Sequence, residues 1–523
     1  MVMIIYQFTG LIPSQFTCTE LNLSCYVTYG QKYSDKKMVK MEEIKKGDHM
    51  YETSVIDDDT LEGKGLKKKA VGFWHDVFQA ESHVAPAADV ALLITGTAAI
   101  AFGATPLVIL LTWVGYFVLL NTNYQFSKYL SSSAGYYGFA ANSLGKKWGI
   151  LTGWLFMGDE LLAYPAFGFL GAASLIYLLS PDISSIPYLW ILLILPYMLF
   201  VFLFEYRGIK VSLNYALIAG IIEVSFLMVT SIILIVMAGS SNTLNTFTLK
   251  FTDGSIAPIF LGFIIGITTL SGSGSVVALG EESKNPKKFI PRSMVWVMLL
   301  NLSIIMITYA LTVSWGASNM ASFATSPDPG IIVFHQKLGF IVAMIFVAII
   351  YNSYLMFGLA INNSVSRTMY AMARDGILPR WLHATHKKYK SPHRILMLIT
   401  VAGFAFAIIN GIFFGPFDGG VYPFVMIGIM LLLVHLINNV GLGIFIKKHH
   451  HHFSILYHLV IPVIASALII VAIYYTVIPF PGFPYGVYAV VAAIWVVLGI
   501  VYTEIRAKKV GDIATVNIDR DKI

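Results

Sequence analysis

Four carboxylic acids stand out in this chain because each lies within a stretch of apolar residues. They are Asp89, Asp159, Glu160 and Glu223. A charged side chain at the centre of a lipid bilayer costs about 2.5–3.5 kcal/mol on insertion scales, so each of these groups needs a partner, a proton or a path to water. A cationic solute or a coupling proton would supply one. The four carboxylates therefore indicate chemistry in which a cation or a proton is bound.

Each of these carboxylates has a functional interpretation and a plainer one. Glu223 lies fifteen residues after Gly208, deep in its apolar stretch, where it could hold a proton or a cation. The alternative is a neutral, hydrogen-bonded contact between helices. Asp89 could meet the ammonium group of a solute, and the alternative is a carboxylate that faces a water-filled vestibule. Asp159 and Glu160 are neighbours about 100° apart on a helix, so we expect at most one of them to reach a solute pathway.

Two of the apolar stretches carry residues that interrupt a helix. Pro86 lacks a backbone donor and disfavours helical geometry at Ala85. The run SGSGS at residues 271–275 weakens a helix and offers backbone and hydroxyl groups as ligands. Interrupted helices near the bilayer midplane are where transporters bind solutes, although ordinary membrane helices also tolerate these residues. We expect a solute carboxylate to lie against N–H groups freed at residues 85–88 and 271–274.

The composition requires lipid as the solvent for much of the chain. Its 523 residues are 57% hydrophobic and 12% charged, whereas a soluble domain is about 45–50% apolar and about 25% charged. Runs long enough to span a bilayer recur along the sequence, and we identify no secretory signal before them. We predict an all-α integral membrane protein with about twelve spans. They lie at residues 76–103, 106–127, 148–179, 186–204, 211–238, 257–280, 291–315, 339–366, 395–414, 419–446, 455–478 and 484–504.

The placement of Lys and Arg supports this map. Of the 35 Lys and Arg residues, only Lys250 and Lys337 fall in connections on the opposite side of the membrane from the rest. Because cytoplasmic loops are enriched in Lys and Arg, both termini are predicted to be cytoplasmic and the number of spans to be even. The formal charge of +7 therefore indicates topology and not nucleic-acid binding. We predict a multi-pass protein of the cell membrane.

The two interrupted spans are the first and the sixth, which are equivalent positions in two successive repeats of five helices. That placement is typical of inverted-repeat transporters. Two motifs, which we read as cytoplasmic loops, add a family resemblance: GEESKNPKKFIPR at 280–292 and SRTMYAMARDGILP at 366–379. They resemble the segments after helices 6 and 8 in the amino acid–polyamine–organocation superfamily, and RGIKVS at 207–212 is a weaker match. The resemblance covers residues 70–446 and implies the LeuT-like fold.

The resemblance also suggests which residues form the site. The family's glycine pair in helix 1 is replaced by Ala85 and Ala87, and an aromatic gate in helix 6 is replaced by Thr268. Several relatives carry, at the place of Glu223, a lysine thought to replace a sodium ion, so we predict that Glu223 is the ion-coupling residue. The predicted substrate-binding residues are Ala85, Pro86, Ala87, Ala88, Asp89, Thr268, Ser271, Gly272, Ser273 and Gly274.

The function implied by the resemblance is secondary active transport. We expect a permease for amino acids or related amines, coupled to protons, that alternates access around broken helices 1 and 6. Its expected partners are the solute, H⁺ (with Na⁺ less favoured) and the bilayer. Two alternatives stay open: an amino acid or amine exchanger, and a sensor or partner subunit that has a transporter fold but moves no solute.

Enzymatic and cofactor chemistry is not indicated. We find no nucleotide-binding loop, metalloprotease motif or nucleophile elbow, so we expect no enzyme activity, no cofactor and no metal site. The predicted organisation has five parts. They are a disordered cytoplasmic tail at 1–70, five-helix repeats at 71–240 and 257–446, helices 11 and 12 at 447–504, and a cytoplasmic tail at 505–523.

Overall fold

The computed structural model describes residues 15–18, 25–28, 63, 65–173, 175, 186, 188–326, 328–449 and 452–511. The chain divides into two units, Met1–Asp58 and Asp59–Ile523. In the first unit, strands β1 (Gln15–Cys18) and β2 (Cys25–Thr28) pair in antiparallel fashion. Most of the predicted tail at 1–70, and the end of the tail at 505–523, lie outside the described residues.

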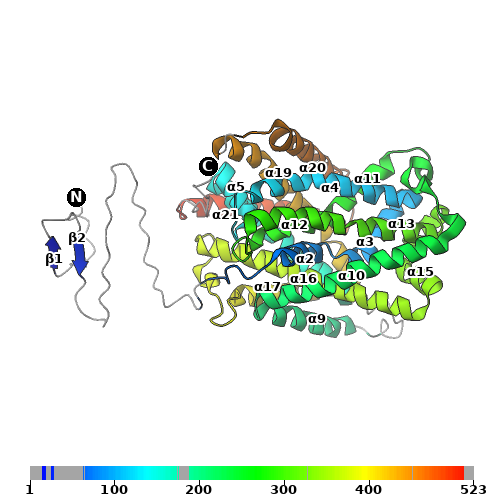
Figure 1. Cartoon of the computed structure of the whole chain (residues 1–523), viewed down its shortest axis with the longest axis horizontal. Helices are drawn as coiled ribbons and strands as arrows, with labels where there is room; N and C mark the ends of the chain where they lie inside the picture. The colour runs from blue at the N-terminus through cyan, green and yellow to red at the C-terminus, as the bar shows by residue number, and fades with distance from the viewer. Residues whose placement is uncertain are drawn as a thin grey trace. The chain divides into compact units, whose positions relative to one another are not determined.

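The described part of the second unit is helical, as predicted, and its helices run side by side along the long axis of the unit (Figure 1). The α-helices are α2 (Phe73–Val84), α3 (Pro86–Ala101), α4 (Thr105–Ser127), α5 (Gly135–Leu144), α6 (Lys146–Ala163), α9 (Leu189–Tyr206), α10 (Ile209–Ala238), α11 (Ala257–Thr269), α12 (Pro286–Leu300), α13 (Leu302–Trp315), α14 (Met320–Thr325), α15 (Pro329–Leu338), α16 (Phe340–Arg374), α17 (His393–Phe414), α18 (Pro416–Val421), α19 (Phe424–His449), α20 (Ile461–Val477) and α21 (Tyr485–Ala507).

Shorter helical turns of other types connect or extend these helices. The π-helical turns are η3 (Tyr164–Leu170) and η10 (Leu456–Val460). The 3₁₀ segments are η2 (Phe102–Ala104), η4 (Gly239–Ser241), η5 (Leu244–Phe247), η6 (Leu249–Thr252), η7 (Leu270–Leu279), η8 (Ala317–Asn319) and η9 (Arg380–His383).

Within the described residues, nine helical segments are long and apolar enough to cross a bilayer. Eight of them coincide with predicted spans 4, 5 and 7–12, and the ninth, Ile94–Ser127, joins the end of span 1 to span 2. Predicted spans 3 and 6 are not among the nine. Span 3 begins in α6, which carries two lysines and two carboxylates, and span 6 changes its helix type part-way. The length and apolar composition of these helices therefore identify the chain as a multi-pass membrane protein.

The predicted break in span 1 is present. Helix α2 ends and α3 begins at Ala85, whose backbone is left-handed with φ 54° and ψ 63°. Pro86 follows at the first position of α3, where its fixed φ suits a helix start and its missing N–H removes no helical bond. Eight of the twelve residues of α2 are buried, so this short helix lies inside the bundle among α10, α12, α16 and η7.

Glycine should be tolerated better at Ala85 than elsewhere in this span. A left-handed backbone costs an L-residue about 1–2 kcal/mol, and glycine escapes that cost. We expect Ala85→Gly to leave the thermal stability in detergent nearly unchanged, because relief of the backbone offsets the lost methyl group. Ala98→Gly, at an equally buried position within α3, should lower stability by about 1 kcal/mol or more. Equal losses at the two sites would contradict a left-handed Ala85.

Span 6 is interrupted by a change of helix type and not by an unwound segment. The α-helix α11 ends at Thr269, and the next ten residues form the 3₁₀ helix η7. A 3₁₀ run of this length is uncommon because its hydrogen bonds are poorly aligned, and such runs often mark hinges. The glycines of the SGSGS run lower the cost of this tighter backbone. The change of helix type therefore coincides with the SGSGS run at which the sequence predicts a break.

The eighth predicted span is longer than expected. We assigned it to 339–366 and treated the following motif as a loop, but α16 continues to Arg374. Arg367, which we had placed in the connection between spans 8 and 9, is fully buried inside this helix. The assignment was wrong because two buried carboxylates neutralise the arginine, so the helix does not need to end where the first cation occurs.

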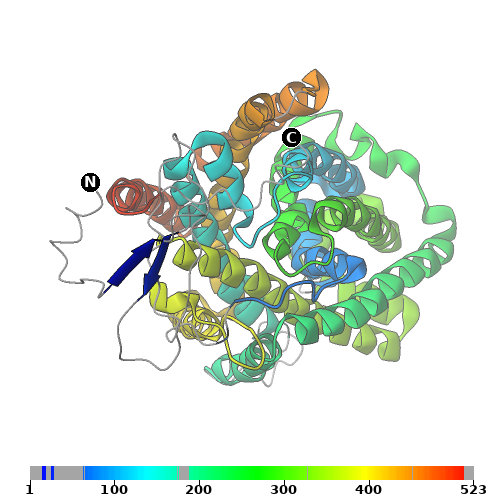
Figure 2. The same ribbon diagram turned by 60° about the vertical axis from the view of Figure 1, so that its left-hand side comes forward.

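The last two helices lie at the edge of the bundle. Figure 2 shows α20 in orange and α21 in red at its periphery. Only 28% and 33% of the residues in their most apolar stretches are buried, the same values as in α9 and α10, compared with 61% for the stretches that contain α4 and α19. Their exposed apolar surfaces are suited to contact with lipid.

Candidate functional site

The first turn of α3 is held by two other helices. Pro86 has no N–H, and the next two backbone donors are both engaged by side chains. Ala87 N donates to Glu223 Oε1 over 2.8 Å, and Ala88 N donates to Ser353 Oγ over 3.3 Å. Ser353 Oγ in turn donates to the same Glu223 oxygen over 2.7 Å. The buried carboxylate of Glu223, from α10, thus joins the start of α3 to α16.

This arrangement changes the expected role of the N-terminus of α3. We predicted that its freed N–H groups bind a solute carboxylate, but in this structure the N–H groups of Ala87 and Ala88 donate to Glu223 and Ser353. Both donors are taken by side chains of the protein. A helix N-terminus favours a negative charge by about 0.3–1 kcal/mol, and by up to about 2 kcal/mol when partly buried. Glu223 supplies that charge from within the bundle.

The second break lies directly against the first. Gly272 in η7 approaches the last turn of α2 so closely that a Cβ on it would stand 2.5 Å from the carbonyl carbon of His83 and 2.7 Å from the backbone nitrogen of Val84. Real Cβ atoms do not come this near to backbone atoms. The absence of a side chain at Gly272 is therefore what allows the two interrupted spans to meet.

The other predicted residues of span 6 have different surroundings. Gly274 packs against the hydroxyl group of Tyr136 in α5. Ser273 is buried, and its hydroxyl lies 3.8 Å from a methionine sulfur of α12. The side chains of Thr268 and Ser271 lie outside the described part of the structure, so their role stays a prediction.

A cavity opens beside the two breaks. Its volume in this conformation is about 50 Å³, which is below the range of about 300–1,000 Å³ that small-molecule sites occupy. Its polar lining is formed by His83, Asp89, Asp159, Glu160 and Ser275, and its aromatic lining by Tyr136, Phe156, Phe167, Phe357 and Phe424.

Three of the four carboxylates singled out in the sequence meet in this cavity. Asp89 from α3 and both Asp159 and Glu160 from α6 line it. We predicted that at most one of the α6 pair reaches a solute pathway; both line this cavity, which covers more of the α6 surface than the roughly 100° between neighbouring residues. Glu160 Oε2 lies 3.8 Å from His83 Nε2. The cavity is thus a strongly acidic site.

His83 and Glu81 are among the ionisable residues of α2 that sequence reasoning missed. His83 lines the cavity. Glu81 is fully buried, and neither of its carboxylate oxygens has a hydrogen-bond partner among the described residues. Both lie inside the range 76–103 that we assigned to span 1, so an inventory of every ionisable residue in that range would have found them.

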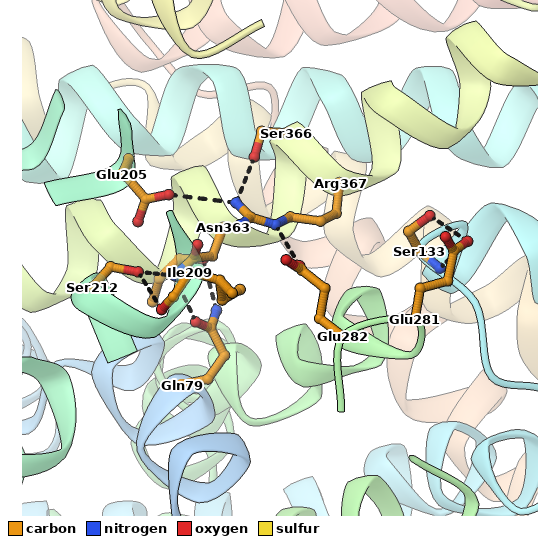
Figure 3. Close-up of polar contacts among 11 residues, drawn as sticks. Gln79, Ser133, Glu205, Ile209, Ser212, Glu281, Glu282, Asn363, Ser366 and Arg367 are labelled. Atoms are coloured by element: carbon orange, nitrogen blue, oxygen red, sulfur yellow. Dashed lines mark hydrogen bonds and ion pairs between the residues drawn. The ribbon is translucent and has the colours of Figure 1, made fainter. Parts of the chain in front are cut away.

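A second polar cluster lies at the far end of α16 and contains its buried arginine (Figure 3). Arg367 Nε donates to Glu282 Oε2 over 2.9 Å, and Arg367 Nη1 donates to Glu205 Oε2 over 3.4 Å. Arg367 Nη1 also donates to Ser366 Oγ over 3.1 Å. The guanidinium therefore ties α9 and α16 to the segment between η7 and α12.

A second ion pair, nearer the surface, also joins α16 to the segment between η7 and α12. Arg374 Nη1 lies 2.8 Å from Glu281 Oε1, and Glu281 also accepts hydrogen bonds from the backbone and hydroxyl of Ser133. Burial by itself would raise the pKa of Glu281, but Arg374 and the Ser133 hydrogen bonds outweigh it and hold this pKa below its usual value. The two long motifs of the sequence, 280–292 and 366–379, thus contact each other through two ion pairs.

Amide and hydroxyl groups connect this cluster to α2. Gln79 Nε2 donates to the backbone oxygen of Ala360 over 2.8 Å. Asn363 Nδ2 lies 3.2 Å from both Gln79 Oε1 and Ser212 Oγ. A polar chain thus runs from α2 through α16 to α10, and Figure 3 shows it beside Arg367. Both halves of the interrupted span are therefore linked to α16 and α10: α2 through Gln79 and Asn363, and α3 through Ser353 and Glu223.

The fold and the site define a multi-pass membrane protein with a small acidic cavity beside a broken helix. Comparison with known families gives its family. The model described as amino acid permease matches residues 75–511. The chain belongs to the amino acid permease family.

Individual relatives are more distant. The chain is 26% identical over 288 residues to the low-affinity putrescine importer PlaP of Escherichia coli (strain K12), a match that covers 53% of this chain and 61% of that protein. It is 26% identical over 147 residues to the branched-chain amino acid permease BcaP of Bacillus subtilis (strain 168), covering 26% and 28%. An uncharacterized transporter of Mycobacterium tuberculosis (strain ATCC 25618 / H37Rv) is 31% identical over 130 residues, covering 25% and 29%. The chain therefore matches less than two thirds of the length of these relatives.

Proposed function

We propose that this chain is a secondary active transporter that carries a small amino acid or amine across the cell membrane, driven by protons. The observation that carries the proposal is the contact of Glu223 with the start of α3, next to the acidic cavity. Family membership supports the transport of such solutes. The names of two relatives, a putrescine importer and a branched-chain amino acid permease, agree with it.

The proposed architecture has twelve spans. Spans 1–5 and 6–10 form two inverted repeats, interrupted at Ala85 and at η7, and α20 and α21 lie outside this core. The paired positions of the two breaks and the peripheral place of the last two helices in Figure 2 support this arrangement. The Lys and Arg distribution supports a cytoplasmic location of both termini. In the proposed site, the solute contacts residues 85–89 and η7.

The hydrogen bonds that Glu223 accepts from α3 and α16 support proton coupling. As a carboxylate Glu223 accepts hydrogen bonds from Ala87 N and Ser353 Oγ, so it clamps α3 to α10 and α16. Binding of a proton removes the charge that the N-terminus of α3 attracts and weakens this clamp by about 0.3–2 kcal/mol. A shift of 1.4 kcal/mol changes a conformational equilibrium about tenfold. Protonation can therefore favour movement of α3 relative to α10 and α16, which is how access would alternate.

Glu223→Gln tests this coupling directly. Glutamine keeps the shape and can still accept the Ala87 hydrogen bond, but it does not titrate. In proteoliposomes the variant should bind solute with nearly wild-type affinity and lose accumulation driven by an inward proton gradient. The matched control is Glu504→Gln, whose exposed side chain pairs with Lys147 on the outside of the bundle. That variant should accumulate solute like the wild type.

Two results would count against proton coupling at Glu223. If Glu223→Gln concentrates solute with the wild-type pH dependence, the coupling group lies elsewhere, and Asp89 and Glu160 are the next candidates. If the wild type requires sodium at every pH, the driving ion is not the proton. The exchanger and the non-transporting sensor remain distinct outcomes: the first gives counterflow without net accumulation, and the second gives solute binding without flux.

A further inference from the structure

We propose that a phosphate group binds in a second pocket, which lies where the C-terminal ends of α16 and α21 meet. The phosphate belongs either to the headgroup of an anionic lipid or to a soluble anion, and the surroundings of the pocket favour the lipid. This pocket shares no lining residue with the acidic cavity. A phosphate would therefore bind here whether or not the chain carries the proposed solute.

The second pocket is positively charged. Its volume is about 280 Å³, and its ionisable lining residues are Arg380, Arg506, Lys509 and Asp375. Asp375 already has a cationic partner outside this lining, because its Oδ1 lies 3.4 Å from Arg374 Nε. Three cations thus face the pocket without a matching anion among the described lining residues. A phosphate group carries up to about two negative charges at pH 7 and would balance most of them.

Hydrogen-bond donors without a partner line the same pocket. Arg380 and Lys509 are exposed, and neither side chain has a hydrogen-bond or ion-pair partner among the described residues. The Nε atom of Arg506 is buried and likewise has none within the described part of the chain. Buried donors are rarely left unpaired. A guanidinium presents its N–H groups in a planar fork that matches phosphate oxygens, and a lysine adds a compact charge.

Hydrogen bonds between the two helix ends fix the walls of the pocket. Arg506 Nη2 of α21 donates to the backbone oxygen of Gly376, in the turn that follows α16. Tyr502 Oη, one helical turn earlier, donates to the backbone oxygen of Ile377 over 2.6 Å. The end of α21 is therefore docked on the end of α16 before any anion binds. Such preorganisation lowers the entropy that binding costs.

The surface beside the pocket suits a lipid. Helix α21 lies at the edge of the bundle (Figure 2), and its residues Val501 and Ile505 are each 51% exposed. Lys509 follows at the same spacing of four residues, so it ends this exposed apolar stripe. Trp381, next to Arg380, is 54% exposed, and tryptophan is enriched where membrane meets water. A lipid that rests its chains on α21 would place its phosphate among these basic residues.

Thermal unfolding of the purified full-length protein in a neutral detergent detects the interaction. Dioleoylphosphatidylglycerol should raise the unfolding midpoint by about 3 °C or more above the value with dioleoylphosphatidylcholine, because a ligand of the folded state stabilises it. Sodium phosphate, compared with sodium chloride at equal ionic strength, tests a soluble source. A larger shift with the anionic lipid assigns the site to a headgroup, and a shift with phosphate that this lipid does not exceed assigns it to a soluble anion. Both results support a phosphate site, and no shift with either anion would refute it.

A pair of double variants locates the site. Arg380→Gln combined with Lys509→Gln removes two exposed cations of the pocket. Each basic residue near an anionic lipid contributes a factor of about five to affinity, so the half-saturating concentration of the stabilising anion should rise about 20–30-fold. The matched control is Lys447→Gln combined with Lys448→Gln, which removes two exposed cations from the last turn of α19 and should change little.

The comparison separates a defined site from general attraction between charges. Because all four side chains are exposed, both double variants should unfold at the wild-type midpoint when no anion is added. Equal weakening in the two double variants would show a diffuse basic surface and overturn the pocket. Wild-type affinity in the variant that lacks Arg380 and Lys509 would also overturn it.

Discussion

Replacing Arg367 with methionine is expected to destabilise the protein by about 3–5 kcal/mol, because the change leaves two buried carboxylates without their cation. Arg367 is fully buried, and its guanidinium lies 2.9 Å from Glu282 and 3.4 Å from Glu205. Methionine fills much of the same volume, so the loss is electrostatic and not a cavity effect. Thermal unfolding in detergent, followed by the fluorescence of the nine tryptophans, measures it.

Two further variants establish the cause of this loss. Adding Glu205→Gln and Glu282→Gln to Arg367→Met removes the uncompensated charges and should restore much of the stability. Lys147→Met breaks an ion pair whose side chains are 57% and 52% exposed, and it should cost about 0–1 kcal/mol. If Arg367→Met were no more harmful than Lys147→Met, the buried ion-pair cluster would not stabilise the fold.

Gly272→Leu is the substitution expected to reduce transport most. A Cβ at this position would meet the backbone of His83 and Val84 at 2.5–2.7 Å, so leucine must push η7 away from α2. His83 and Val84 line the cavity, and an error of about 1 Å in positioning can reduce activity about a hundredfold. We expect solute uptake and binding both to fall by about that factor or more. Filter-binding and uptake assays measure the two losses.

A glycine elsewhere in the broken span provides the matched control. Gly96 lies on an exposed face of α3, and a Cβ there would meet nothing within 4 Å. Gly96→Leu should therefore bind and transport solute like the wild type. If Gly272→Leu retains wild-type affinity, the close contact between the two breaks is not part of the binding site.

The helical fold and the positions of both breaks could be predicted from the sequence because their signals are local. Apolar length gives a span, proline ends a helix, and a run of serine and glycine weakens one. The break at Ala85 and the change at Leu270 are both where these signals place them. The predicted loop after span 8 was wrong because an arginine was treated as a sign of the membrane surface.

The contacts that form the site depend on packing between distant helices, which no local pattern encodes. Nothing in the residues around Ala87 indicates that Glu223 accepts its hydrogen bond from 136 positions away. The helical position of Asp159 and Glu160 correctly gives the angle between them, but not the width of the cavity that both reach. The same holds for the pairing of Arg367 with Glu282, which unites two motifs that looked independent in the sequence.

Uptake into proteoliposomes tests the central claim, that this chain is a proton-driven carrier of a small amine or amino acid, most directly. A panel of radiolabelled amino acids and amines is offered with and without an inward proton gradient in sodium-free buffer. The account predicts concentrative uptake of at least one of these solutes, which a protonophore abolishes. Uptake of every solute at the rate of protein-free liposomes, or accumulation that needs sodium and ignores the proton gradient, would contradict it.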